Sequence, residues 1–352
     1  MNIAYQRLYN QRLSETTFKT PEEVVGWLGA VQSQDYAGAK WALGLRLQGV
    51  TDADIEQAFT EGSILRTHVM RPTWHFVAPT DIRWLLALTA PRVNALNAYY
   101  YRQLELDDAL FLHSHDAVAN ALRGGKQLTR VELGSVLAQI GIDASGMRLG
   151  YIVHRAELDG IVCSGARRGK QFTYALLDER VPETRTLSRD EALAELTKRY
   201  FTSHGPAMIQ DFVWWSGLTT ADAKSGLEMS RAHLTQETID GKIYWFSSSM
   251  PVTNRLIPPA LLLPPYDEYT IAYKDHSAIL DPAYGEQAKT QLYGGAAVSD
   301  SQAVGYWRRT FSKGTAVIEI APFRPLDATE RDAFAAAAQH YGEFLGLPAV
   351  LT

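Results

Sequence analysis

Cysteine is the scarcest functional residue in this sequence, because the 352 residues contain only Cys163. A single cysteine excludes an internal disulfide and a zinc site built from several thiolates, and it fits a reducing compartment. We therefore expect a cytoplasmic protein. The nine histidines are dispersed, with no neighbouring set of His, Asp and Glu at ligand spacing. We expect neither a bound metal nor another cofactor.

Long hydrophobic runs are also missing. No stretch reaches the roughly 18 apolar residues that a membrane-spanning helix needs, and the N-terminus lacks the basic and then apolar pattern of a secretory signal. We expect no membrane association. The composition, 46% hydrophobic and 21% charged, is that of ordinary globular proteins, and the length predicts two to four domains.

Positive charge is not in excess, since 34 Lys and Arg face 39 Asp and Glu for a net charge of −5. Proteins that grip nucleic acid through its phosphates usually carry a basic domain or stripe. The overall balance thus counts against DNA binding but leaves room for a local basic patch. The turn containing Arg167, Arg168 and Lys170 is such a patch, and it suits either phosphate contact or a solvated hairpin tip.

What the sequence does contain is a recurring order of helices followed by a β-ribbon. Capping signals at residues 20–23, 129–132 and 188–191 mark the starts of three predicted helices. These helices are expected to end near residues 31, 139 and 201. Further helices are expected over residues 7–13, 51–59 and 145–158, and after 205 and 219. The β-prone pairs are 63–70 with 73–77, 161–164 with 171–175, and 234–239 with 242–246. The last pair is joined by Asp240-Gly241, a strong hairpin signal.

Three such units predict three winged helices, although plain α+β packing has the same order of elements. From residue 258 onward, short alternating segments split by glycine and polar turns predict a small barrel or sheet, closed by a helix over about 328–345. We therefore predict an α+β chain with three tandem winged-helix units and a small C-terminal β-barrel or sheet with a terminal helix. The predicted domains are 1–120, 121–185, 186–257 and 258–352.

The segment Gln32-Ser33-Gln34-Asp35 is expected at the end of the apolar helix, before a loop that leads to Trp41. Carboxamides do not exchange protons near neutral pH, but they can hold a water molecule or hydrogen-bond the edges of a base. Asp35 could be a base or a charge stabiliser, and it could equally cap the following backbone. Thr73 and His75 share one face of a strand, where they could contact DNA or be structural.

Five motifs occur along the chain in a specific order. They are Gln32-Ser33-Gln34, Met70-Arg71-Pro72-Thr73-Trp74-His75, the segment from Gly205-Pro206 to Leu218, the segment from Leu263-Pro264 to Asp275, and Gly305-Tyr306-Trp307-Arg308-Arg309. In this order and spacing they resemble the AlkZ-like bacterial DNA glycosylases of the tandem winged-helix superfamily. The resemblance covers nearly the whole chain. It departs at Ser33, where the family usually has an apolar residue, and at Pro72, where we would expect glycine.

The resemblance implies a monofunctional glycosylase that removes purines alkylated at N7 or N3 from duplex DNA, with Gln32 and Gln34 as the catalytic pair. Gln34 places the chain outside a sister branch that has Gln-x-Asp. Arg71, Thr73 and His75 of the ribbon and the basic turn at 167–170 are the expected DNA contacts. We expect a monomer. The alternative is a non-catalytic winged-helix DNA-binding or regulatory protein.

Overall fold

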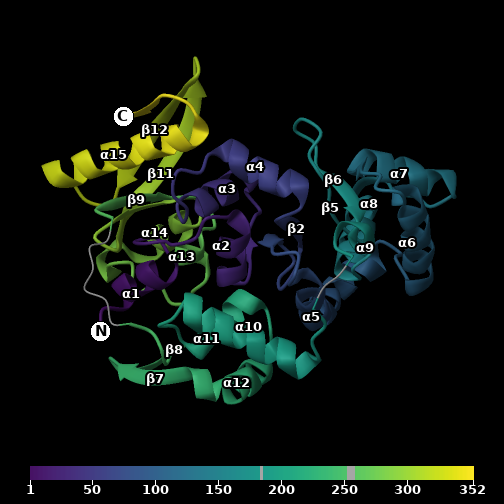
Figure 1. The fold of residues 1–352 in the computed structure, drawn as a ribbon, viewed down its shortest axis with the longest axis horizontal. Coiled ribbons are helices and arrows are strands. Elements are labelled where there is room, and N and C mark those ends of the chain that lie inside the picture. Colours follow the sequence, from purple (N-terminus) through teal and green to yellow (C-terminus); the bar gives the residue numbers. More distant parts are fainter. Residues whose placement is uncertain (183–184, 252–257) are drawn as a thin grey trace. The chain divides into compact units, whose positions relative to one another are not determined.

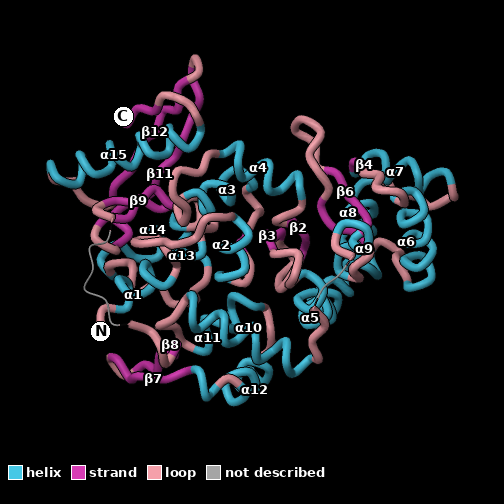
Figure 2. The backbone as a smooth tube through the Cα atoms, in the orientation of Figure 1, coloured by secondary structure: helices cyan, strands magenta, loops and turns pink. Residues whose placement is uncertain are grey.

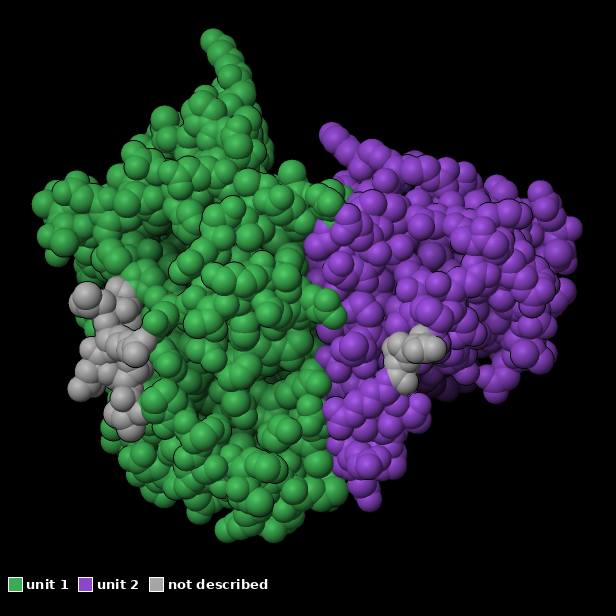
Figure 3. Space-filling model, viewed as in Figure 1, with its two compact units in different colours: residues 1–57, 193–215, 219–352 green, residues 58–192, 216–218 purple. Residues whose placement is uncertain are grey.

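The computed structural model describes residues 1–182, 185–251 and 258–352. The chain forms two compact units, each assembled from separate stretches of sequence (Figure 3). Unit 1 comprises residues 1–57, 193–215 and 219–352, and unit 2 comprises residues 58–192 and 216–218. The finer division into four domains remains a prediction. Within the described ranges, no helix is long and apolar enough to cross a membrane.

The N-terminal elements of unit 1 differ from expectation at two places. They are α1 (Ile3–Asn10), α2 (Pro21–Leu28), β1 (Val31–Gln32), α3 (Tyr36–Gly44) and α4 (Asp52–Glu61), the last of which continues into unit 2. The lead helix begins four residues earlier than expected, because the Asn2 side chain caps it by accepting the Tyr5 N–H. The expected loop before Trp41 is the helix α3.

Unit 2 contains a β-hairpin, two long helices and a helix pair with its own small sheet. Its elements are β2 (Leu65–His68), β3 (Trp74–Val77), α5 (Ile82–Gln103), α6 (Asp108–Leu122), β4 (Leu128–Thr129), α7 (Arg130–Gln139), α8 (Gly146–Leu158), β5 (Val162–Ser164), β6 (Thr173–Leu176) and α9 (Leu177–Arg180). Strands β2 and β3 pair antiparallel as expected, and β6 lies between β4 and β5. The capping box of α7 is present, with the Thr129 and Glu132 side chains each bonded to the other's backbone N–H. Apolar residues of α6, α7 and α8 form one core of this unit.

The central part of unit 1 repeats the order of helices and hairpin. It contains α11 (Ile209–Ser216) and α12 (Thr220–Met229), the 3-10 turn Arg231–His233, and the strands β7 (Leu234–Ile239) and β8 (Lys242–Ser247). Helix α10 (Arg189–Ser203) precedes them, and Figure 2 shows α10, α11 and α12 leading to this hairpin. Asp240 and Gly241 both have positive φ, at 48° and 75°, as a two-residue hairpin turn requires. The predicted hairpin is confirmed in register.

The C-terminal part of unit 1 is an open sheet. The sequence predicted either a small barrel or a sheet, and the structure has the sheet. Its strands lie in the order β13-β12-β11-β10-β9, which leaves β13 and β9 at the two edges. The elements are β9 (Ala260–Leu263), α13 (Glu268–Ile271), the 3-10 turn Pro282–Tyr284, α14 (Gly285–Leu292), β10 (Ala296–Ser299), β11 (Gln302–Ser312), β12 (Thr315–Pro322), α15 (Ala328–Leu345) and β13 (Ala349–Leu351).

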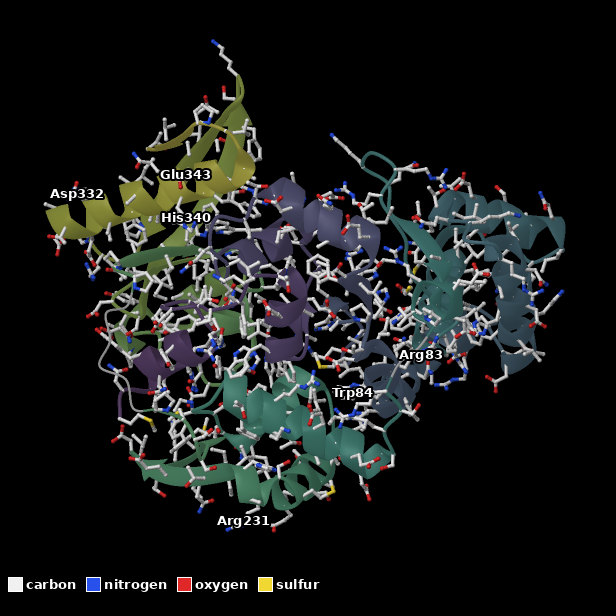
Figure 4. The ribbon with its side chains drawn as sticks, in the orientation of Figure 1. Arg83, Trp84, Arg231, Asp332, His340 and Glu343 are labelled. Atoms are coloured by element: carbon white, nitrogen blue, oxygen red, sulfur yellow. The ribbon has the colours of Figure 1, made fainter. Side chains whose placement is uncertain are left out.

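The terminal helix α15 covers this sheet, as Figure 1 shows. Aromatic side chains of α15 pack against α3. The ring of Trp41 on α3 lies 5.0 Å from the rings of Tyr341 and Phe344 and 5.2 Å from that of His340. Figure 4 labels Asp332, His340 and Glu343 along the same helix. Helix α3 is thereby packed against the helix that covers this sheet.

Candidate active site

The Gln-Ser-Gln segment lies between α2 and α3, and none of its three residues is helical. Helix α2 ends at Leu28 because Gly29 has φ +86°, a conformation that residues with a side chain rarely adopt. A Cβ at Gly29 would also lie 3.5 Å from the Trp215 ring. The chain then turns into the short strand β1, which ends at Gln32. The expectation that the helix runs on to Val31 is therefore wrong.

A buried carboxylate from a distant part of the sequence holds this strand. Oε1 of Glu268 accepts the backbone N–H of Gln32 at 3.0 Å, and Oε2 accepts the indole N–H of Trp215 at 2.8 Å. His204 contributes a third neighbour, with Nε2 3.4 Å from Oε2. Glu268 and His204 are both fully buried. The backbone position of Gln32 is thus fixed by a side chain that water cannot reach.

Glu268 remains a carboxylate despite its burial. Burial alone would raise the pKa of Glu268, but contacts with His204, Gln32 and Trp215 outweigh this effect and lower the pKa overall. For His204 the direction is also downward, because burial disfavours the imidazolium more than Glu268 favours it. The pair is therefore an ionised acceptor beside a histidine with a lowered pKa, and Glu268 is a structural anchor.

Asp35 caps α3. Its Oδ1 accepts the Gly38 N–H at 2.8 Å, so the capping interpretation is confirmed. A Cβ at Gly38 would lie 3.2 Å from both Asp35 Cγ and Pro264 Cβ, so glycine allows the close approach of these groups. Arg309, from the Gly-Tyr-Trp-Arg-Arg motif, places its guanidinium 4.0 Å from Asp35. A carboxylate with these two partners is poorly placed to be the base.

Residues in the segment 262–268 hold α3 in place as well as β1. The Trp41 indole donates to the Leu262 carbonyl at 2.7 Å. Arg46, which follows α3, makes a bidentate ion pair with Asp267 at 2.8 and 2.9 Å, and both side chains are fully buried. Asp267 and Glu268 are therefore structural. Sequence reasoning missed that these two residues hold a segment more than 200 residues away.

The two glutamines occupy unequal environments. Gln32 is 5% exposed, and the adjacent Ser33 is fully buried. Gln34 is exposed, directly before the Asp35 cap. A carboxamide here can accept and donate hydrogen bonds but has no proton to exchange near neutral pH. The geometry therefore offers one solvent-accessible amide beside a buried one, on a backbone held in place.

The lysine nearest in sequence is engaged. Nζ of Lys40 lies 2.8 Å from Asp52 and 2.8 Å from Glu56, and the residue is only 5% exposed. Tyr36 also donates to Glu56, at 3.2 Å. The amino group of Lys40 is therefore engaged by two carboxylates rather than presented to a substrate.

The ribbon residues expected to contact DNA lie in unit 2. His75 is fully buried, and its Nδ1 lies 2.9 Å from the Thr73 carbonyl. Burial, followed by the nearby Arg71, lowers the pKa of His75 well below its usual value. A fully buried histidine favours the structural alternative for His75, and direct DNA contact by this residue stays a prediction. Thr73 and Arg71 are partly exposed.

The basic turn between β5 and β6 is only partly available to a ligand. Arg168 forms a bidentate pair with Glu132, at 2.5 and 3.0 Å, and this pair lowers the pKa of Glu132 to about 2. Arg167 lies over the Phe172 ring at 5.2 Å. Lys170 is exposed at the tip. The charge of Arg168 is thus largely compensated, whereas Lys170 is presented to solvent.

Comparisons with known proteins identify the family and the fold. The family model for DNA glycosylase AlkZ-like matches residues 25–344. An interstrand DNA cross-link repair glycosylase of Streptomyces sahachiroi is 26% identical over 226 residues, which are 61% of this chain and only 59% of that relative's length. The structure of the Streptomyces sahachiroi DNA glycosylase AlkZ has the same fold, with a TM-score of 0.83 and 22% identity over 100% of this chain and 98% of that chain. Because the family model covers most of its length, the chain belongs to the DNA glycosylase AlkZ-like family.

Proposed function

We propose that this protein is a monofunctional DNA glycosylase that hydrolyses the N-glycosidic bond of purines alkylated at N7 or N3 in duplex DNA. The observation that carries the proposal is the fixed Gln32–Gln34 segment, in which an exposed carboxamide follows a backbone anchored by the buried Glu268. Gln32 and Gln34 are the residues we assign to catalysis. We further propose that it works in the cytoplasm as a monomer.

Neutral amides suffice because the substrate supplies most of the driving force. A purine alkylated at N7 or N3 carries a positive charge and leaves without strong acid catalysis. The remaining tasks are to place a water molecule at the anomeric carbon and to support the positive charge that develops on the sugar. Preorganised dipoles do this at low cost, because they need no reorientation as the bond breaks. Two amide oxygens at one site can accept both hydrogens of the water.

Water, rather than an amine, is the nucleophile in this proposal. A bifunctional glycosylase would form a Schiff base with a lysine, which requires a neutral amine. Lys40 follows the glutamine pair on α3, but Asp52 and Glu56 hold its ammonium at 2.8 Å each. The product is therefore a free base and an intact abasic site.

DNA contacts are proposed for unit 2, where the acidic excess of the chain is absent. Unit 2 carries 16 Lys and Arg against 15 Asp and Glu, so the excess of acidic residues lies in unit 1. Lys170 at the tip of the β5–β6 turn, with Arg167 behind it, is the proposed phosphate contact. Arg71 and Thr73 of the β2–β3 hairpin are proposed as further contacts.

The three helix-and-hairpin groups are proposed to be winged helices. The groups are the elements up to the β2–β3 hairpin, α7 and α8 with β5–β6, and α10 to α12 with β7–β8. Each has the helix and ribbon that a winged helix places in and beside a DNA groove. The corresponding domains are 1–120, 121–185, 186–257 and 258–352.

The test is incubation of the protein with duplexes that carry N7-methylguanine, N3-methyladenine or an interstrand cross-link. The cross-link is included because the Streptomyces relative is named for its repair. We expect a free base and an abasic site, with no covalent adduct trapped by borohydride. A trapped adduct would refute the water mechanism. Salt-dependent binding without release of any base would favour the non-catalytic DNA-binding alternative.

A further inference from the structure

A pocket lies wholly within unit 2, and it shares no residue with the Gln32–Asp35 segment. Its volume is about 280 Å³, and its walls come from the β2–β3 hairpin, α5, α7, α8 and β6. Pockets that enclose drug-sized ligands begin near roughly 300 Å³. The pocket is therefore sized for a single ring system rather than for a long ligand.

One wall presents a buried hydrogen-bond acceptor. Oε2 of Glu157 is hydrogen-bonded to Nδ1 of His68, which places the imidazole proton on that nitrogen. Glu157 is 1% exposed, and it lines the pocket together with His68. The second oxygen of this carboxylate, Oε1, is a strong acceptor for an N–H that enters the pocket.

The same wall presents a donor without an acceptor. Nε2 of His154 is buried and has no hydrogen-bond partner among the described residues. Its other nitrogen, Nδ1, lies 3.5 Å from the Asn97 side-chain nitrogen, so Nδ1 accepts and the proton lies on Nε2. Burial, aided by the neighbouring His68, lowers the pKa of His154 to about 3, so the ring is neutral at pH 7.

His154 and Glu157 are three residues apart on α8, so the donor and the acceptor face the same side of the helix. Aromatic rings complete the pocket, because Trp74, Tyr151 and Tyr174 all line it. A pocket lined by aromatic rings, with one donor beside one acceptor, suits a planar nitrogen heterocycle.

A cation lies at the rim. Arg130 lines the pocket and is exposed, and its guanidinium lies over Gly150, where a Cβ would approach Nη2 to 2.4 Å. Glycine at position 150 is thus required for this placement of Arg130. A guanidinium beside an aromatic pocket suits a phosphate attached to the ring system.

We propose that this pocket binds one unpaired nucleobase, with the phosphate of the same nucleotide at Arg130. The Watson–Crick edge of each base carries an N–H beside a ring nitrogen or carbonyl oxygen. That N–H donates to Oε1 of Glu157, and the neighbouring acceptor receives the Nε2–H of His154. The source of the nucleotide is either a DNA strand or the free pool, and both share this chemistry.

Calorimetric titration of the intact chain with dAMP tests the proposal. The comparison ligands are purine 2′-deoxyribonucleoside monophosphate, which lacks the 6-amino group, and 2-deoxyribose 5-phosphate, which lacks the base. We expect dAMP to bind about tenfold more tightly than the purine analogue, because the N–H that reaches Glu157 is lost. The sugar phosphate should not bind measurably. Equal affinity for all three ligands would overturn the proposal.

Variants of residues that line the pocket test whether dAMP binds there. Met147 is 57% exposed and lines the pocket, so Met147→Trp fills the pocket from the rim without breaking the buried pair. His154→Phe removes the donor and keeps a ring. Each change should weaken dAMP binding about tenfold or more. The exposed His113 supplies the matched control, since His113→Phe should leave binding unchanged. Unaltered affinity in both pocket variants would overturn the assignment, because both replaced residues line the pocket.

A short oligo(dA) strand and a fully paired duplex distinguish the sources. Tighter binding of the strand than of dAMP identifies an unpaired nucleotide in DNA, and equal binding identifies the free nucleotide. Binding of the duplex alone, unchanged by Met147→Trp, would contradict the proposal. Gln34→Ala leaves this pocket intact, so base release and nucleotide binding can fail independently.

Discussion

Replacing Glu268 with glutamine tests whether a buried carboxylate positions the catalytic segment. The carboxylate has two oxygens and uses both, one for the Gln32 N–H at 3.0 Å and one for the Trp215 N–H at 2.8 Å. A carboxamide has one oxygen and one NH₂ group. In Glu268→Gln, one of the two donors must therefore face another donor.

The expected cost follows from this geometry. A hydrogen bond to a charged acceptor contributes about 1.5–3 kcal/mol, and a buried donor left unsatisfied costs about 1–3 kcal/mol. We expect Glu268→Gln to lower the free energy of unfolding by about 2–4 kcal/mol. A shift of the Gln32 backbone by about 1 Å would also slow base release roughly 10²-fold, because rates depend steeply on alignment. Binding of undamaged duplex should change little.

Urea denaturation and single-turnover base release measure the two effects. Glu343→Gln is the matched control, because Glu343 is exposed on α15 (Figure 4). The pKa of Glu268 is lowered in the folded state from about 4.5, so its stabilisation is complete above that value and declines as the pH falls through the folded-state pKa. The stability gap between wild type and Glu268→Gln should therefore narrow in acid. Equal stability and equal release rates at pH 7 would refute the reasoning.

Other predictions concern Gly29 at the end of α2, Lys170 in the β5–β6 turn, and the ion pair between Arg168 and Glu132. Gly29→Ala should cost about 1–2 kcal/mol in thermal unfolding because φ is +86°, and an unchanged melting temperature would count against this backbone. Lys170→Glu should weaken binding to all duplex sequences alike and reduce the salt dependence, and a sequence-selective loss would contradict a phosphate contact. The NMR titration midpoint of Glu132 should lie near pH 2 and rise in Arg168→Gln, whereas an unchanged midpoint would contradict the pair.

Features with local causes could be predicted from the sequence. The capping boxes at Thr20 and Thr129 set the starts of α2 and α7, because the cap and its partner are three residues apart. The Asp240-Gly241 turn fixed the β7–β8 hairpin in the same way, since positive φ at both positions is a property of these residues. The family resemblance added the glutamine pair, which composition alone would not have singled out.

Features with distant causes could not be predicted. Residues 24–31 have the apolar character of one continuous helix, but Gly29 ends it and Glu268, 236 residues from Gln32 in sequence, captures the strand that follows. Helix α3 is rich in glycine and alanine, so its pattern resembled a loop. Its stability comes from Asp35, from Trp41 against α15, and from Arg46 with Asp267.

The most direct measurement of the central claim is single-turnover release of 7-methylguanine by the Gln32→Ala, Gln34→Ala double variant, with duplex binding followed by fluorescence anisotropy. Loss of both carboxamides should slow release by about 10²-fold or more, the size expected when preorganised dipoles are removed, while binding of the lesion duplex persists. Release at the wild-type rate would contradict the claim that these two amides carry the reaction.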